Sequence, residues 1–92
     1  MHVLRIEHDV ASYEAWKDAF DSDPLGREAG RALGHRVFRA SSDPNHVLID
    51  LDFAEVGDAD AFLARLRDLW GRVDVMKNPT AQVVEVVETA QY

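Results

Sequence analysis

Hydrophobic and polar residues alternate along residues 46–53, which read His-Val-Leu-Ile-Asp-Leu-Asp-Phe. In an extended chain the odd-numbered positions, from Val47 to Phe53, would all point to one side, and the even-numbered positions would point to the other. This period of two predicts a β-strand with one hydrophobic face and one mixed face that carries Asp50 and Asp52. The hydrophobic face needs covering helices, so we expect the rest of the chain to be organised around this strand.

Three further stretches have the alternation or the valine content of strands, namely residues 1–8, 35–40 and 81–88. The Ser-Ser-Asp-Pro-Asn sequence at residues 41–45 predicts a hairpin turn, because Pro and Asn favour the dihedral angles of turns. Antiparallel pairing around this turn would place Arg36 beside Asp50 or Asp52. Residues 76–80 are predicted to form the loop before the last strand.

An amphipathic helix is predicted at residues 13–20, because Tyr13, Trp16 and Phe20 are spaced by three and four and form one hydrophobic stripe. Ser12 is a suitable N-cap, since its hydroxyl oxygen can accept a hydrogen bond from a backbone N–H in the first turn. The stripe would cover the hydrophobic face of the sheet.

The next segment is predicted to be a shorter helix at residues 25–33, begun by Asp23 and Pro24 and ended by Gly34 in the left-handed conformation. A longer helix is predicted to be capped at residues 57–58 and to run into the second half of the chain. Its core-facing stripe consists of Phe62, Leu66, Leu69 and Val73.

The predicted element order is β-α-β-β-α-β. Two such halves give a ferredoxin-like α+β domain, a four-stranded antiparallel sheet with both helices on one face. Residues 1–8 and 46–53 would form the two central strands. A chain of 92 residues accommodates a single core, so residues 1–92 are expected to form one domain.

The face of the sheet without helices is predicted to be neither fully polar nor fully hydrophobic. A small domain buries little surface by itself, so a partner sheet explains this mixed face better than solvent does. We therefore expect a homodimer formed through the open sheet face. The residues predicted on this face are Val3, Arg5, Glu7, Arg36, Phe38, Leu48, Asp50, Asp52, Val83, Glu85 and Val87.

The composition excludes several classes of function. With 17 acidic and 10 basic residues the net charge is −7, which argues against binding to nucleic acids or anionic membranes. There is no cysteine, which excludes disulfides and thiolate chemistry. No stretch is long and apolar enough for a membrane span, and the first residues lack a signal-peptide layout. We therefore expect a cytoplasmic protein.

Residues 10–20, Val-Ala-Ser-Tyr-Glu-Ala-Trp-Lys-Asp-Ala-Phe, resemble the V-x-D-Y-x-x-W-K-x-x-F segment of small dimeric α/β-barrel proteins. Residues 34–39, 43–45, 47–53 and 78–85 also fit that pattern. The superfamily includes antibiotic-biosynthesis monooxygenases, polyketide cyclases and stress-responsive barrel proteins. Ser12 stands where the pattern usually has Asp, a change that preserves the capping role.

The resemblance implies a ferredoxin-like protomer, two of which pack sheet against sheet into a dimeric α/β barrel with the helices outside. Members that are enzymes typically bind a hydrophobic, often aromatic compound in a cleft between sheet and helices, without a metal or an organic cofactor. The resemblance therefore implies that this chain needs no cofactor either.

His8 is the candidate catalytic residue. It ends the first strand on the side that faces the helices, and its imidazole could act as a base on an acidic phenol or β-diketone. The alternative is a half-exposed histidine without a role. The candidate substrate-binding residues are Tyr13, Trp16, His35 and Trp70.

These candidates also have structural interpretations. Aromatic residues at helical spacing, such as Tyr13 and Trp16, belong to a core more often than to a ligand cage. A buried indole N–H needs an acceptor, which a pocket could supply to Trp16 and Trp70. His35 either lies near a wet strand end or lines the cleft.

Asp50 and Asp52 could form an acid–base pair or, with His46, a metal site. Arg5 and Arg36 are predicted nearby, and arginine favours the ionised carboxylate, so we interpret these residues as an ion-pair network. No metal site is predicted. Two functions follow: a cofactor-independent monooxygenase or polyketide cyclase acting on an aromatic polyketide-like molecule, or a non-catalytic module that binds a hydrophobic ligand or serves assembly.

Overall fold

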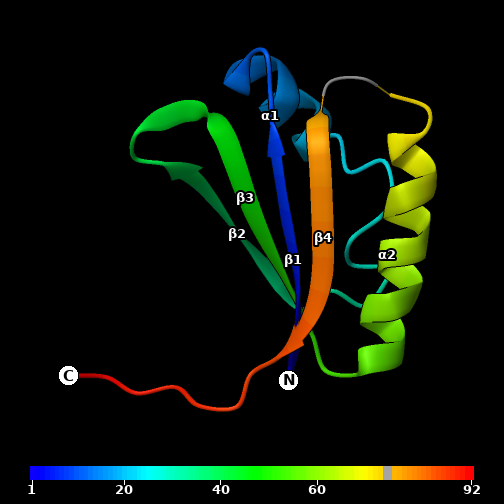
Figure 1. Ribbon diagram of the computed structural model, residues 1–92. Coiled ribbons are helices and arrows are strands. Elements are labelled where there is room, and N and C mark those ends of the chain that lie inside the picture. Colours follow the sequence, from blue (N-terminus) through cyan, green and yellow to red (C-terminus); the bar gives the residue numbers. More distant parts are fainter. Residues whose placement is uncertain (74–75) are drawn as a thin grey trace.

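The computed structural model describes residues 1–73 and 76–92. The elements in chain order are β1 (His2–Asp9), α1 (Tyr13–Asp21), β2 (Gly34–Ala40), β3 (Asp43–Phe53), α2 (Val56–Trp70) and β4 (Lys77–Glu85). The four strands form one antiparallel sheet in the order β2-β3-β1-β4. Both helices lie on the same side of this sheet (Figure 1). The predicted ferredoxin-like α+β fold is confirmed, and so are its two central strands.

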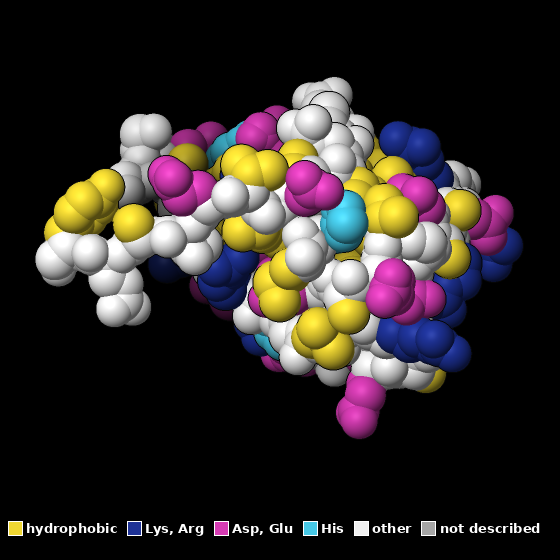
Figure 2. Space-filling view, turned by 90° about the horizontal axis from the view of Figure 1, so that it is seen from below, with side chains coloured by type: hydrophobic (Ala, Val, Ile, Leu, Met, Phe, Trp, Pro, Cys, Tyr) yellow, Lys and Arg dark blue, Asp and Glu magenta, His cyan; other side chains and the backbone are white. Residues whose placement is uncertain are grey.

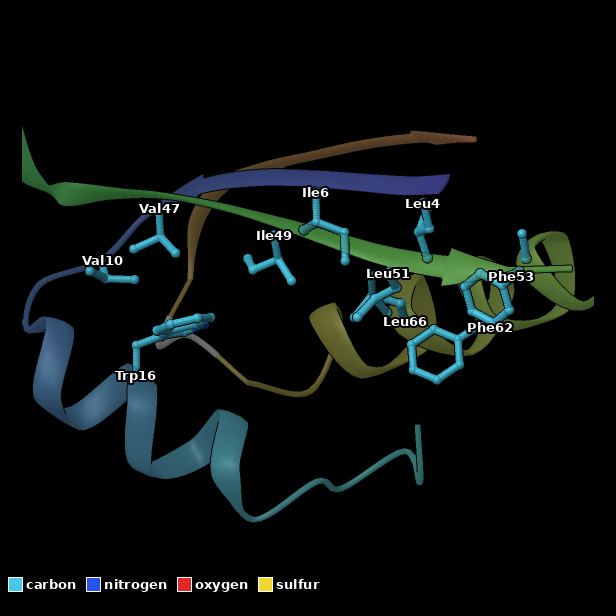
Figure 3. Close-up of a cluster of buried hydrophobic side chains, with 11 residues drawn as sticks. Leu4, Ile6, Val10, Trp16, Val47, Ile49, Leu51, Phe53, Phe62 and Leu66 are labelled. Atoms are coloured by element: carbon cyan, nitrogen blue, oxygen red, sulfur yellow. The ribbon is translucent and has the colours of Figure 1, made fainter. Parts of the chain in front are cut away.

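The core lies between the sheet and the helices. From the sheet it receives Leu4 and Ile6 of β1 and the odd-numbered positions of β3 from Val47 to Phe53, all buried. This is the hydrophobic face that the alternation predicted. Figure 3 shows these side chains pointing from the sheet toward Trp16 of α1 and toward α2.

α1 begins as predicted, because the Ser12 hydroxyl accepts a hydrogen bond from the backbone N–H of Ala15 at 3.2 Å. α2 begins earlier than predicted, at Val56, and Glu55 occupies its N-cap position without a side-chain hydrogen bond. The prediction of a cap at residues 57–58 was therefore wrong. The first part of the predicted core stripe of α2 is buried, whereas Leu69 is half-buried and Val73 is exposed.

The predicted helix at residues 25–33 was wrong, and the segment forms a series of turns. Gly26 and Arg31 have φ of 70° and 73°, in the left-handed region that interrupts a right-handed helix. Asp23 also has a positive φ, and its carboxylate accepts a hydrogen bond from the backbone N–H of Arg27 at 2.9 Å. Gly34 does not take the left-handed position and instead begins β2.

β4 begins and ends earlier than predicted, because residues 77–80 belong to the strand and residues 86–88 do not. Its register pairs Val83 with Leu4, so both side chains face the helices, and Val83 packs against the core. The placement of Val83 on the open face was therefore wrong. Glu85 pairs with His2 on the covered side, 3.7 Å from its imidazole, and Val87 lies beyond the strand.

The hairpin between β2 and β3 is tighter than predicted, since the turn consists of Ser41 and Ser42 and β3 already begins at Asp43. Beyond β4, residues 86–92 leave the body of the molecule (Figures 1 and 2). In the part of the chain that the structure describes, no helix is long and apolar enough to cross a membrane.

Candidate functional site

A cavity of about 300 Å³ lies between the sheet and the helices. Ile6, Ile49 and Leu51 form the sheet side of it, and α1, α2 and part of residues 22–27 form the other walls. Its lining is predominantly hydrophobic. This volume falls within the range of sites for small organic molecules, about 300–1,000 Å³.

His8 lies at the cavity and is only 1 % exposed. Residue parity along β1 places it on the same face as Leu4 and Ile6, and its ring centroid lies 5.5 Å from that of Trp16. Its Nδ1 is 3.3 Å from the backbone oxygen of Asp9. His8 is therefore buried under an indole ring and is not half exposed at the strand end.

Burial lowers the pKa of His8, because the charged imidazolium loses its hydration; the hydrogen bond to the backbone oxygen of Asp9 opposes this effect. The imidazole is therefore held neutral near pH 7. A neutral imidazole can accept a proton, which is the state that a general base requires.

This lowered pKa predicts a loss of stability in acid. Below about pH 6.5, His8 binds a proton in the unfolded chain but remains neutral in the folded chain. Protonation therefore stabilises the unfolded state, and the free energy of unfolding falls as the pH falls. We expect His8→Phe to become more stable relative to the wild type as the pH decreases from 7 to 5. Denaturant titrations at several pH values measure this difference.

His46 supplies the control for that experiment. The hydrogen bond with Asp9 raises the pKa of His46, so its stabilising contribution is present at low pH and is lost as the pH rises through the folded-state pKa. Replacing His46 by Asn should therefore change the pH profile in the opposite sense. A His8→Phe profile parallel to that of the wild type would contradict the proposed neutral state of His8.

The aromatic candidates on α1 form a row of rings. Trp16 is buried between Tyr13 and Phe20, at centroid distances of 5.8 and 5.1 Å. Trp16 and Phe20 line the cavity. Tyr13 contacts Trp16 but does not line the cavity. The guanidinium carbon of Arg39 lies 4.5 Å from the centroid of the Tyr13 ring. The structure therefore brings Trp16 to the cavity together with His8 and places Tyr13 one ring away.

His35 and Trp70 have different positions. His35 is exposed on β2 and does not line the cavity; its ring is nearly perpendicular to that of Phe20, with the centroids 5.1 Å apart. Trp70, at the end of α2, lines the cavity. Its Nε1 is buried, and no described group accepts a hydrogen bond from it. A buried donor without an acceptor is costly, so an acceptor for this N–H would stabilise the protein.

The turns between α1 and β2 supply a wall of the cavity that the sequence did not predict. Leu25 and Arg27 line the cavity, and the Arg27 guanidinium lies 3.9 Å from the centroid of Phe20 while donating to the backbone oxygen of Phe20 at 2.8 Å. Arg65 of α2 donates to the backbone oxygen of Leu25 at 3.0 Å. Gly26, which has a positive φ, was a sequence signal for this turn, but the prediction of a helix at residues 25–33 overlooked it.

On the open face, Asp50 is only 3 % exposed and carries the predicted ion-pair network. Its two carboxylate oxygens accept hydrogen bonds from Arg5, both at 3.1 Å, and Arg36 donates to the same carboxylate at 3.2 Å. The hydrogen bond to Asp50 raises the pKa of Arg5. Arg36 also lies 3.6 Å from Asp52. A carboxylate held by two guanidiniums is an ion-pair centre rather than a general acid.

The fold and the cavity together define a ferredoxin-like α+β protein with a hydrophobic pocket between sheet and helices. No model of a known protein family matches the sequence, and no curated protein does. Solved structures do match over nearly the full chain. A dimeric ferredoxin-like protein from an uncultured marine organism has a TM-score of 0.72 and 17 % identity, with 97 % of each chain covered.

Two other similar structures carry an enzymatic description. A candidate antibiotic biosynthesis monooxygenase from Deinococcus radiodurans has a TM-score of 0.65 and 17 % identity, with 100 % of this chain and 98 % of the other covered. An antibiotic biosynthesis monooxygenase has a TM-score of 0.60 and 15 % identity, with 96 % of this chain and 100 % of the other covered. At these identities the similarity establishes the shared fold.

Proposed function

We propose that this chain is a cofactor-independent monooxygenase or cyclase that binds a hydrophobic, aromatic polyketide-like molecule in the cavity between sheet and helices. The observation that carries the proposal is the buried, neutral His8 at the edge of a hydrophobic cavity. Trp70 also lines this cavity, and among the described residues its Nε1–H has no acceptor. The similarity to antibiotic biosynthesis monooxygenases supports it.

The chemistry assigned to these residues is a proton transfer. His8 would accept a proton from an acidic C–H or phenol, and Trp70 would donate to the oxygen on which negative charge develops. With anthrone as substrate, the carbanion formed by His8 would add to O₂, and the peroxide anion would take the proton back from the imidazolium. The resulting hydroperoxide would lose water by cleavage of its O–O bond and of the remaining C–H bond at the same carbon. The overall reaction converts anthrone and O₂ to anthraquinone and water.

Binding is tested by filling the cavity. Ala19 of α1 lines the cavity, and we expect Ala19→Phe to weaken anthrone binding about 10-fold or more, because the added ring occupies the space that the ligand requires. Quenching of the fluorescence of Trp16 and Trp70, both at the cavity, measures the affinity directly.

The matched control is Ala15→Phe, the same substitution at an exposed position of the same helix. We expect it to bind anthrone as the wild type does. Equal affinity in both variants, or no binding by the wild type, would remove the cavity from the proposal.

The alternative is a non-catalytic module of the same fold that binds a hydrophobic ligand or serves assembly. One observation favours it: the hydrogen bond of the His8 ring goes to the backbone oxygen of Asp9, and no carboxylate orients the imidazole among the described contacts. Tight binding of anthrone without turnover would select this alternative.

We further propose that two protomers associate through their open sheet faces. Phe38 is 44 % exposed on this face, next to the Asp50 network, in a position that a second sheet would cover. The similarity to a dimeric ferredoxin-like protein supports the association.

A further inference from the structure

Arg27 lines the hydrophobic cavity and has no part in the proposed proton transfer. It lies in the turns between α1 and β2, and only 19 % of its side chain is exposed. Among the described residues that line the cavity, Arg27 is the only one with a positive charge, because His8 is neutral. A guanidinium that has lost much of its hydration needs acceptors for its five N–H donors.

The position of this guanidinium is fixed by three contacts. Its Nη1 donates to the backbone oxygen of Phe20 at 2.8 Å and lies 3.5 Å from Oδ1 of Asp23. Its central carbon lies 3.9 Å from the centroid of the Phe20 ring. Both polar contacts use the same nitrogen, and in the part of the chain that the structure describes no group accepts a hydrogen bond from Nε or Nη2. The remaining donors can therefore bind a ligand in the place of water, and the group that carries them is already held in position.

Asp23 is the acidic residue on the same wall, among the residues that the structure describes. Its Oδ1 also accepts a hydrogen bond from the backbone N–H of Arg27 at 2.9 Å, so this carboxylate helps to form the turn. Its charge offsets part of the charge of Arg27. Recognition of an anion therefore depends on directional, charge-assisted hydrogen bonds from the guanidinium and not on the net charge of the wall.

Asp23 and Arg27 also border a second hollow, a groove on the outer side of the turns that is further lined by residues 31–35. Most of these residues are exposed, so the groove is open to water. A charged group that lies at Arg27 can keep part of its hydration on this side. This lowers the cost of bringing it to the wall of a hydrophobic cavity.

His8 and Arg27 lie at the two ends of a row of rings along the cavity. The ring centroids of His8 and Trp16 are 5.5 Å apart, those of Trp16 and Phe20 are 5.1 Å apart, and Arg27 covers Phe20. Trp16 and Phe20 are separated by about one helical turn, 5.4 Å. A molecule that reaches from His8 to Arg27 has to extend past both rings, which suits a system of fused rings with a polar group at its end.

We propose that Arg27 determines the specificity of the cavity by binding a carboxylate of the ligand, so that the preferred substrate is an aromatic polyketide-like carboxylic acid and not a neutral molecule. The ring system would lie along Trp16 and Phe20, with its acidic C–H or phenol at His8. A carboxyl group is what the end of a polyketide chain supplies. The inference rests on the proposed function and adds the charge of the substrate to it.

The test compares two ligands that differ in charge and hardly in shape, an anthraquinone carboxylate and the corresponding anthraquinone carboxamide. Neither has the C–H that His8 would deprotonate, so binding is measured without turnover. At about pH 8 the carboxyl group is ionised. Tryptophan quenching should give an affinity about 5-fold or more higher for the carboxylate, because charge-assisted hydrogen bonds are roughly twice as strong as neutral ones.

Variants of Arg27 decide which residue causes this preference. Arg27→Met keeps the hydrophobic stem and removes the donors, so we expect equal affinities for the two ligands. Arg27→Lys keeps the charge and loses the planar fork, so part of the preference should remain. The matched control is Arg67→Met, the same substitution at an exposed position of α2 that does not line the cavity, and its preference should equal that of the wild type.

The ratio of the two affinities separates recognition from a structural role. If Arg27 only held the turn, Arg27→Met would weaken both ligands alike and leave the ratio unchanged, and this result would overturn the inference. Equal binding of both ligands by the wild type would also overturn it. If the wild type bound neither ligand, the cavity and the proposed function would fail together. A carboxylate preference that depends on Arg27 in a protein without turnover would support the inference and contradict only the enzymatic function.

Discussion

Replacing His8 by phenylalanine is expected to reduce the turnover of an anthrone-type substrate by about 100-fold or more, because a positioned general base contributes about 10²–10⁴ to the rate. Phenylalanine fills the same buried space beside Trp16, so the cavity and the fold are retained while the proton acceptor is lost. Oxygen consumption and the absorbance of the quinone product measure the turnover, and tryptophan quenching measures the affinity separately.

The matched control for this prediction is His35→Phe. His35 is exposed and does not line the cavity, although its ring packs against that of Phe20, so its replacement should leave turnover within about twofold of the wild type. If His8→Phe binds and converts the substrate as the wild type does, His8 is not the base. If the wild type binds anthrone but shows no turnover, the non-catalytic alternative holds.

Replacing Phe53 by alanine is expected to lower the free energy of unfolding by about 3–5 kcal/mol. Phe53 is fully buried at the end of β3, and its ring centroid lies 5.8 Å from that of Phe62 on α2. The surrounding backbone cannot collapse into the space, because β1 pairs with β3 at this point and only two residues separate Phe53 from the start of α2. Urea titration followed by circular dichroism measures the loss.

Phe38→Ala is the control on the opposite face of the same sheet. At concentrations at which the protein is monomeric, we expect it to lower the free energy of unfolding by less than about 1 kcal/mol, since the side chain is already half in solvent. At higher concentrations it should weaken self-association. Similar losses for Phe38→Ala and Phe53→Ala in the monomer would contradict the assignment of covered and open faces.

The alternation along β1, β2 and β3, together with the element order and the hairpin turn, was sufficient to predict the sheet, its central strands and the position of Arg36 beside Asp50 or Asp52. The same reasoning did not succeed for β4. That stretch has valines at both odd and even positions, Val83 and Val84 among them, so the period of two does not select a face. The register of β4 with β1 decides which of its side chains face the helices, and this register is established only in the folded sheet.

Part of the candidate site could also be predicted from the sequence. Strand parity identified His8 as a residue that faces the helices, and the spacing along α1 identified Trp16. The burial of His8 depends on how closely α1 packs against the sheet. This distance cannot be deduced from the spacing of hydrophobic residues in either element. The wall formed by residues 22–27 depends on left-handed residues such as Gly26 and on a hydrogen bond from α2, which are tertiary features.

The hydrogen bond between Arg65 and the backbone oxygen of Leu25 has a kinetic consequence. This hydrogen bond connects α2 to the turn that forms one wall of the cavity. A Cβ atom at Gly30 would lie 2.6 Å from the same guanidinium, so the segment before β2 and the helix are in close contact. A molecule that entered past this turn would have to break the hydrogen bond between Arg65 and Leu25. We therefore expect the residence time of a ligand to depend on a contact that does not touch the ligand.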